Sequence, residues 1–127
     1  MDWIITDVRQ TNLLEINSNT PTLDHIKFRK VTGIDGTGSY TFDTHYIEWS
    51  YGSAEQVLNR FETNGSTSVW TFNNIMQSPF YTAEGQSLVQ DDILSSKKLH
   101  VVIAAQQQLK HAEDINFTLI GEVKIRN

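Results

Sequence analysis

The feature that most constrains this chain is a long period-two pattern near its C-terminus, over residues 115–125. Successive side chains of a strand point to opposite faces, so the pattern predicts a strand with one buried and one solvent-facing side. Gly121, in the middle, predicts a bulge, a bend or the close approach of another backbone. The apolar residues that share one parity are Ile115, Phe117, Leu119, Val123 and Ile125.

The preceding segment predicts a second strand and a hairpin. Residues 99–105 are apolar without clean alternation, which is typical of a central strand covered on both faces, although a short buried helix has the same pattern. Residues 106–114 are rich in helix formers, and we interpret them as the arm and loop of a hairpin rather than as a helical turn. The end of the chain is therefore expected to form two antiparallel strands.

Shorter patterns upstream predict further strands. Ile26 and Phe28 alternate with charged neighbours, so residues 26–29 are expected to form a half-buried strand. Asn64 and Gly65 form the strongest turn signal in the chain and lie between two stretches of strand formers. We therefore expect a hairpin centred on them.

The apolar alternation within residues 40–51 changes parity. Tyr40 and Phe42 lie at even positions, whereas Trp49 and Tyr51 lie at odd positions. Such a change requires a bulge or a turn, which we place at residues 43–44.

Three further segments have weaker signals. Residues 53–63 fit a short helix capped by Ser53 as well as a strand, because their apolar residues recur at helical spacing. Residues 3–8 and 13–16 are apolar runs that we expect to form one or two strands. Residues 86–96 are expected to include a helical turn.

Together these elements predict the class of fold. The chain has 127 residues, the usual size of one domain, so we expect residues 1–127 to share a single core. The prediction is an all-β protein, or a mainly β protein with one or two short helices, arranged as an antiparallel β-sandwich. A closed β-barrel is the alternative.

Composition and charge argue against several classes of function. The chain has 10 basic and 15 acidic residues and no concentrated basic patch, so we do not expect it to bind nucleic acid. It has no cysteine, which excludes disulfides and cysteine-based sites and is typical of a reducing compartment. It shows neither a signal peptide nor an apolar run long enough to cross a membrane. We therefore expect a soluble protein without a transmembrane segment, located in the cytoplasm or exported without a classical signal peptide.

No group of residues has the spacing of a catalytic or metal site. The glycine-rich residues 33–39 lack the Gly-Lys-Ser/Thr ending and the following helix of a phosphate-binding loop, so we expect a hairpin loop there. The four histidines are scattered, and the acidic pairs at residues 91–92 and 113–114 are typical of solvated loops or helix starts. We therefore expect no enzyme activity, no cofactor and no metal.

Aromatic residues are concentrated between residues 40 and 81. Core packing accounts for many of them, because aromatic side chains are favoured in strands. Exposed tryptophan and tyrosine also form sugar-binding platforms and membrane-interface surfaces. We therefore expect a non-enzymatic binding module that recognises a glycan or a lipid surface through Trp49, Tyr51 and Trp70.

Part of this region resembles a family of membrane-active proteins. Residues 36–38 (Gly-Thr-Gly), 47–49 (Ile-Glu-Trp) and 52–53 (Gly-Ser) are similar to the central stretch of aegerolysins, small β-sandwich proteins that bind membrane lipids and assist pore-forming partners. The family's Trp-Cys-Pro-Trp-Gly-Ser segment is not reproduced, since the chain has no cysteine and no proline near Trp49. The resemblance implies a lipid-binding, toxin-associated role.

The C-terminal strand predicts an alternative function. The edge of a sheet offers unpaired backbone groups with which another chain can pair. The alternative is therefore a structural or assembly subunit that oligomerises through its strand edges, with another protein or further copies of itself as its partner.

Overall fold

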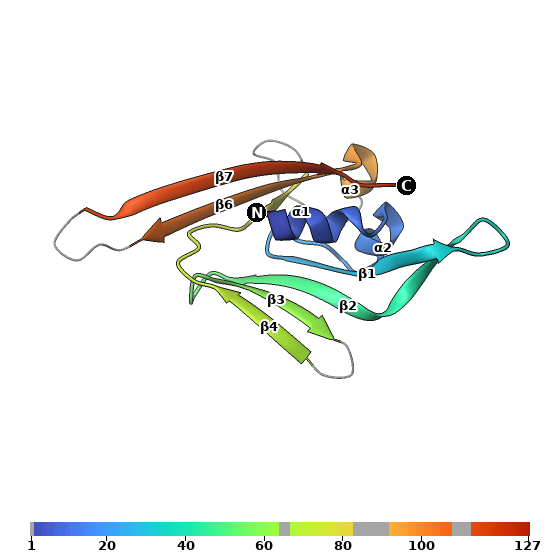
Figure 1. Ribbon diagram of the computed structural model, residues 1–127. Helices are drawn as coiled ribbons and strands as arrows, with labels where there is room; N and C mark the ends of the chain where they lie inside the picture. Colours follow the sequence, from blue (N-terminus) through green and yellow to red (C-terminus); the bar gives the residue numbers. More distant parts are fainter. Residues whose placement is uncertain (1, 64–66, 83–91, 108–112) are drawn as a thin grey trace.

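The computed structural model describes residues 2–63, 67–82, 92–107 and 113–127, and its strands form two antiparallel sheets (Figure 1). One sheet is a meander in the order β1 (His25–Ile34), β2 (Tyr40–Gly52), β3 (Val57–Thr63) and β4 (Thr67–Phe72). The other has the order β5 (Phe80–Tyr81), β6 (Lys98–Gln107) and β7 (Ile115–Lys124). The expected mainly β, antiparallel class is confirmed, and the described strands do not close into a barrel.

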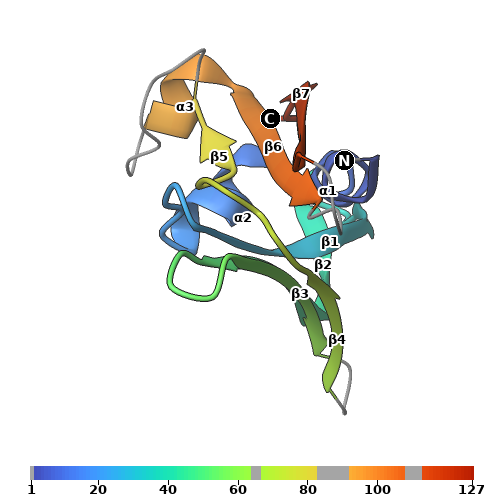
Figure 2. The same cartoon turned by 90° about the vertical axis from the view of Figure 1, so that its left-hand side faces the viewer.

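Helices α1 (Asp2–Arg9) and α2 (Leu13–Ser18) lie between the two sheets, as both ribbon views show (Figures 1 and 2). The prediction of strands over residues 3–8 and 13–16 is therefore wrong. Ile4 and Val8 are one helical turn apart, and both side chains reach the core. The Asn12 side chain accepts a hydrogen bond from the Glu15 backbone N–H and caps α2. This Asn-x-x-Glu spacing was the sequence signal for a helix start.

One hydrophobic core joins both sheets and the helices. Its largest fully buried side chains are Phe28 on β1, Trp49 on β2 and Phe80 on β5. Ile93 of the short helix α3 (Asp92–Ser96) also enters it, so the predicted helical turn is confirmed for the described part of residues 86–96. Residues 86–91 lie outside the described part.

The middle of the chain follows most of the sequence predictions. Arg29 pairs with Tyr46 and Val31 pairs with Phe42, so β2 carries extra residues where the parity change predicted a bulge. β3 and β4 pair up to Thr63 and Thr67, which confirms the hairpin whose turn lies outside the described residues. The helical alternative for residues 53–63 is wrong, because β3 pairs with strands on both sides and its alternate residues are buried.

The long β6–β7 hairpin is confirmed, but its predicted burial is not. The two strands pair without a shift from Lys98 opposite Lys124 to Gln107 opposite Ile115, and the register continues through Gly121 without a bulge. Val123 is buried, whereas the β7 side chains from Ile115 to Ile120 are exposed. The reason is visible in Figure 1, where the hairpin extends beyond the helices and the other sheet. The apolar face of β7 therefore runs out past the end of the core.

Candidate functional site

The projecting part of the hairpin, residues 103–107 and 115–121, is called the arm here. It carries four exposed large apolar side chains on a strand at the end of its sheet. No charged residue lies between Asp114 and Glu122. Proteins usually protect such edges with charges, prolines, bulges or covering segments. The exposed fractions are 40% for Ile115, 49% for Phe117, 53% for Leu119 and 65% for Ile120.

The backbone of β7 presents hydrogen-bonding groups to solvent along its outer edge. On the far side of β6, the Val102 N–H donates to the Pro79 carbonyl and the Ala104 carbonyl accepts from the Met76 N–H. Backbone groups alternate sides along a strand, so the odd-numbered residues of β6 bond to their odd-numbered partners on β7. The even-numbered residues of β7 therefore point their N–H and C=O groups outward.

This free edge has a defined length. Beyond β7, Arg126 bridges to Asn12, and its carbonyl accepts a hydrogen bond of 2.9 Å from the Leu13 N–H. The edge is thereby covered at its C-terminal end. Among the described residues, no further backbone hydrogen bond reaches this edge between Asp114 and Lys124, although α1 contacts β7.

The three aromatic residues predicted to bind ligand do not form one surface. Trp49 and Tyr51 are buried, with 1% and 7% of their surface exposed. The Trp49 indole N–H donates to Asp7, and the Tyr51 hydroxyl donates to the Ile75 carbonyl. Trp70 alone of the three is exposed. The alternation in β2 indicated a strand but not which of its faces the helices and the second sheet cover.

Sequence reasoning missed the aromatic partner of Trp70. The Trp3 and Trp70 rings lie 5.1 Å apart at 60°, and their exposed fractions are 53% and 43%. Phe72 contacts Trp3 from below the surface, with 5.5 Å between ring centres. An apolar cavity of about 50 Å³ adjoins these rings, far smaller than the roughly 300 Å³ at which ligand pockets begin. The pair is therefore a surface feature rather than a pocket.

A buried ion pair lies beneath this pair of rings. Asp7 of α1 accepts hydrogen bonds from Arg60 of β3, at 2.8 Å from Nε and 3.1 Å from the terminal guanidinium nitrogen. Arg60 also bonds to Glu62 at 2.9 Å, and its guanidinium lies 4.7 Å from the centre of the Trp70 ring. The hydrogen bonds that Arg60 donates to Asp7 are the main reason that the pKa of Arg60 is raised. These contacts join α1 to the four-stranded sheet.

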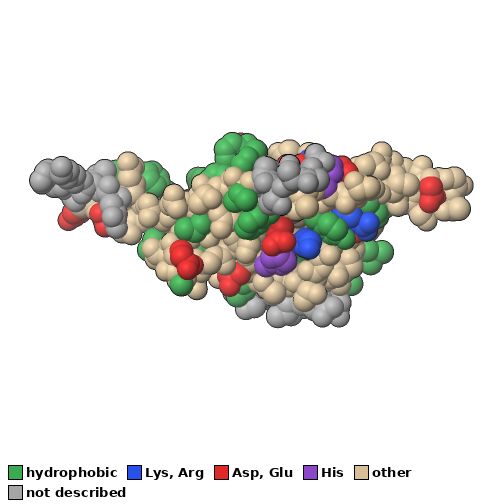
Figure 3. Space-filling model, turned by 90° about the horizontal axis from the view of Figure 1, so that it is seen from below, with side chains coloured by type: hydrophobic (Ala, Val, Ile, Leu, Met, Phe, Trp, Pro, Cys, Tyr) green, Lys and Arg blue, Asp and Glu red, His purple; other side chains and the backbone are tan. Residues whose placement is uncertain are grey.

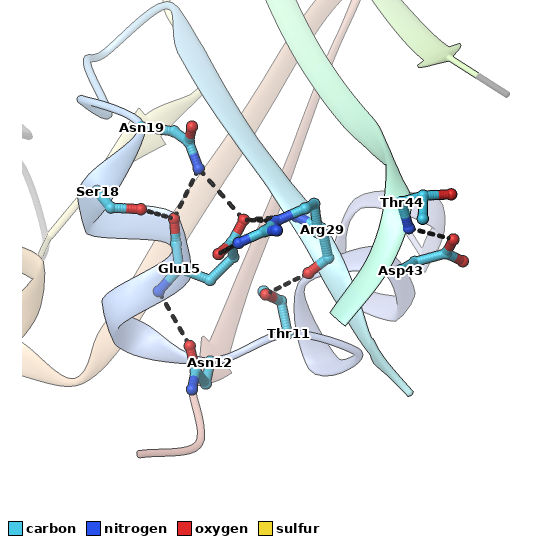
Figure 4. Close-up of polar contacts among 8 residues, drawn as sticks. All are labelled: Thr11, Asn12, Glu15, Ser18, Asn19, Arg29, Asp43 and Thr44. Carbon is cyan, nitrogen blue, oxygen red and sulfur yellow. Dashed lines mark hydrogen bonds and ion pairs between the residues drawn. The ribbon is translucent and has the colours of Figure 1, made fainter. Parts of the chain in front are cut away.

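A second ion pair joins α2 to β1 (Figure 4). The buried Glu15 carboxylate accepts from the Arg29 side chain at 2.8 and 2.9 Å and from the Arg29 backbone N–H at 3.2 Å. Burial alone would raise the pKa of Glu15, but the hydrogen bonds and charge of Arg29 lower it overall. Glu15 also lines an open surface cavity of about 500 Å³. Both of its carboxylate oxygens, however, already accept hydrogen bonds from Arg29.

We expect Glu15→Gln to lower the free energy of unfolding at neutral pH by about 2 kcal/mol, through loss of a charged hydrogen-bond acceptor. A carboxyl whose pKa is lowered on folding stabilises the protein above its ordinary pKa, so wild-type stability should fall as the pH drops below about 4.3. The variant should lose less stability over that range. Urea unfolding followed by tryptophan fluorescence at several pH values measures both effects.

The matched control is Glu122→Gln, which changes an exposed carboxylate 3.4 Å from Lys98. Such pairs contribute about 0–1 kcal/mol. If Glu15→Gln behaves like this control at neutral pH, the ion pair with Arg29 does not stabilise the fold as described.

The glycine-rich loop between β1 and β2 is filled by one of its own side chains. The Asp35 carboxylate accepts from the backbone N–H groups of Thr37 and Ser39 and from the Thr37 hydroxyl. Chiefly because of the Thr37 hydroxyl bond, the pKa of Asp35 is lowered. An acidic group thus occupies the position that a bound phosphate would need, which agrees with the predicted hairpin loop.

Charged and histidine side chains gather over the middle of the face seen in Figure 3. On β1 and β2, His25 and Lys27 lie 3.3 and 4.0 Å from Glu48, and on β2 His45 lies 3.0 Å from Asp43. Within the described ranges, no three His, Asp or Glu side chains are grouped so that they could hold a metal ion. Within the same ranges, no helix is long and apolar enough to cross a membrane.

Comparisons with known proteins do not assign the chain to a family. No family model matches the chain, no curated protein matches it, and no solved structure matches it. The resemblance to aegerolysins gains no support from them.

Proposed function

We propose that this protein is a non-enzymatic assembly subunit that joins a partner through the free edge of β7. The observation that carries the proposal is the projecting arm, where the outer edge of β7 has no paired strand among the described residues and exposed apolar side chains lie on its uncharged stretch between Asp114 and Glu122. Partners that add a strand to a sheet gain affinity from main-chain hydrogen bonds and specificity from alternate side chains. Exposed apolar area of this kind is typical of interaction sites.

Pairing of a partner strand with this edge would be energetically favourable. In the arm, residues 74–76 bond to Ala104 and Gln106 along the far side of β6, whereas β7 lies at the other end of the sheet. A strand added beside β7 would pair the outward groups of Asn116, Thr118 and Ile120 and remove apolar side chains from water. Burial of apolar surface contributes about 25 cal/mol per Å².

Thr118→Pro tests the proposal. Proline lacks a backbone N–H, and Thr118 directs its N–H outward, so the variant should keep the β6–β7 hairpin but lose pairing at the edge. We expect light scattering after size-exclusion chromatography to show an oligomer for the wild type that becomes monomeric in the variant. Thr118→Ala, which keeps the N–H, should remain oligomeric.

Circular dichroism establishes that each variant retains its sheets. A wild type that is monomeric at all concentrations would contradict assembly through further copies of this chain. A folded Thr118→Pro that remains oligomeric would show that assembly uses another surface.

A second candidate function is recognition of a glycan or lipid surface by the aromatic pair of Trp3 and Trp70. Their exposure and their position at the end of α1 and on the outermost strand β4 favour it. Tryptophan at a surface combines apolar area with a polar N–H, as both kinds of ligand require. This candidate keeps Trp70 from the sequence-based site and replaces Trp49 and Tyr51 with Trp3.

A further inference from the structure

We propose that the partner at this edge is a second copy of the same chain, with the two β7 strands antiparallel about a two-fold axis through Leu119. The inference rests on the proposed function, because it names the partner and the register for the same edge. Closed two-fold pairing is the commonest symmetry among protein oligomers, and it requires a self-complementary surface. Three properties of β7 provide that surface.

The first property is the length of the free edge. Among the described residues it has no backbone partner from Asp114 to Lys124, and Asn12 and Leu13 cover the chain at Arg126. Leu119 is its midpoint. A two-fold axis there uses the full open stretch of both copies, and it sets even-numbered residues opposite even-numbered residues. The outward N–H and C=O groups of each copy therefore meet those of the other.

The second property is charge. An axis through Leu119 places Asp114 of each copy opposite Lys124 of the other, which forms two ion pairs. Within one chain, Lys124 lies opposite Lys98, and like charges directly opposite each other destabilise a sheet. An acidic residue on the other side of Lys124 would compensate for this repulsion.

Neighbouring registers lack this match. An axis through Thr118 would set Asp114 opposite Glu122, two acidic residues. An axis through Ile120 would set Lys124 opposite Asn116 and Asp114 opposite Arg126, but the edge at Arg126 is already bridged by Asn12. Charge and the covered end of the edge together therefore select Leu119 among the three central axes.

The third property is the shape of the core-side face. With the axis at Leu119, the exposed Phe117 ring lies opposite Gly121 of the second copy, and the two Leu119 side chains meet at the axis. Glycine leaves space above a strand that an aromatic ring on the neighbouring strand can cover. The pairing thus gives Gly121 a role in the approach of a second backbone, one of the roles its position in the sequence predicts.

Disulfide cross-linking tests the register. The chain has no cysteine, so Leu119→Cys introduces a single thiol per copy. Opposite residues of a pair without hydrogen bonds have Cα atoms about 4.5 Å apart, within the range that a disulfide spans. Mild oxidation should convert this variant to a covalent dimer on a non-reducing gel.

Ile120→Cys is the matched control. Ile120 is more exposed than Leu119, so random collisions would favour its cross-linking. In the proposed register it lies opposite Thr118 instead of its own counterpart, and it should cross-link poorly. Equal or faster cross-linking of Ile120→Cys would overturn the register.

Charge reversal provides a second, independent test. Asp114→Lys and Lys124→Asp each place like charges opposite one another twice, and each should weaken dimerisation roughly tenfold. Mixing the two variants should restore the affinity, because every opposing pair is then Lys with Asp. Both residues are exposed, so the fold should tolerate the changes. Sedimentation equilibrium of each variant and of the mixture measures the effect.

The outcomes separate this inference from the proposed function. If Thr118→Pro abolishes assembly but Leu119→Cys does not cross-link and the mixture is not rescued, the edge is used in another arrangement and only this inference fails. Pairing of β7 with β4, at the end of the other sheet, is one such arrangement. It would form an open chain whose mass grows with concentration. If the wild type is monomeric, this inference fails, and the proposed function then requires a different protein as the partner at this edge.

Discussion

Replacement of Arg60 by alanine is expected to lower the free energy of unfolding by about 3–5 kcal/mol, the usual effect of breaking a buried ion pair. Asp7 is buried and receives two of its hydrogen bonds from Arg60. Without Arg60, its carboxylate keeps the bond from the Trp49 indole but loses the compensating charge. Urea unfolding at neutral pH measures the loss.

Lys98→Ala is the control, because Lys98 forms an exposed ion pair with Glu122. It should lower the stability by less than about 1 kcal/mol. A double variant with Asp7→Leu and Arg60→Met should recover part of the loss, since it leaves no charge of the buried Asp7–Arg60 pair uncompensated. A small effect of Arg60→Ala, similar to that of the control, would mean that water reaches Asp7 in the folded protein.

Replacement of Trp49 by alanine is expected to cost about 3–5 kcal/mol, as for other large aromatic residues of a core. The ring is almost completely buried, stacks on Phe72 at 6.0 Å and donates a hydrogen bond to Asp7. Trp70→Ala should cost about 1 kcal/mol, because this partly exposed ring loses its contacts with Trp3 and with the Arg60 guanidinium. Urea unfolding of both variants measures the two losses in free energy of unfolding.

The same pair of variants tests the aromatic surface. If Trp3 and Trp70 bind a lipid surface or a glycan, Trp70→Ala should lose binding in liposome sedimentation or on a glycan array while its stability changes little. Absence of wild-type binding in both assays would exclude this second candidate for the ligands tested. A Trp49→Ala variant as stable as the wild type would contradict the core position of Trp49.

Local patterns predicted the strands well because they are set by backbone geometry. The alternation around Ile26 and Phe28, the Asn64-Gly65 turn and the parity change in residues 40–51 each correspond to a strand, a hairpin or a bulge. The two N-terminal segments were misassigned because short apolar runs fit both periods. The cap formed by Asn12 favoured the helix there.

The candidate site was less predictable, because it depends on residues distant in sequence. Trp70 becomes part of a pair only when α1 places Trp3 beside it. The partners of Asp7 and Glu15 likewise come from strands that the sequence does not connect to them. No spacing along the chain contains that information.

The sequence by itself determined that residues 115–124 form a strand with one apolar face, because alternation of side chains follows directly from the extended backbone. It also set the uncharged stretch between Asp114 and Glu122 that makes the edge favourable for pairing. Only the tertiary structure decided that this face is exposed from Ile115 to Ile120. The hairpin extends beyond the helices and the other sheet (Figure 1), and only Val123 of β7 is buried, so the apolar side chains of its projecting part have no core to cover.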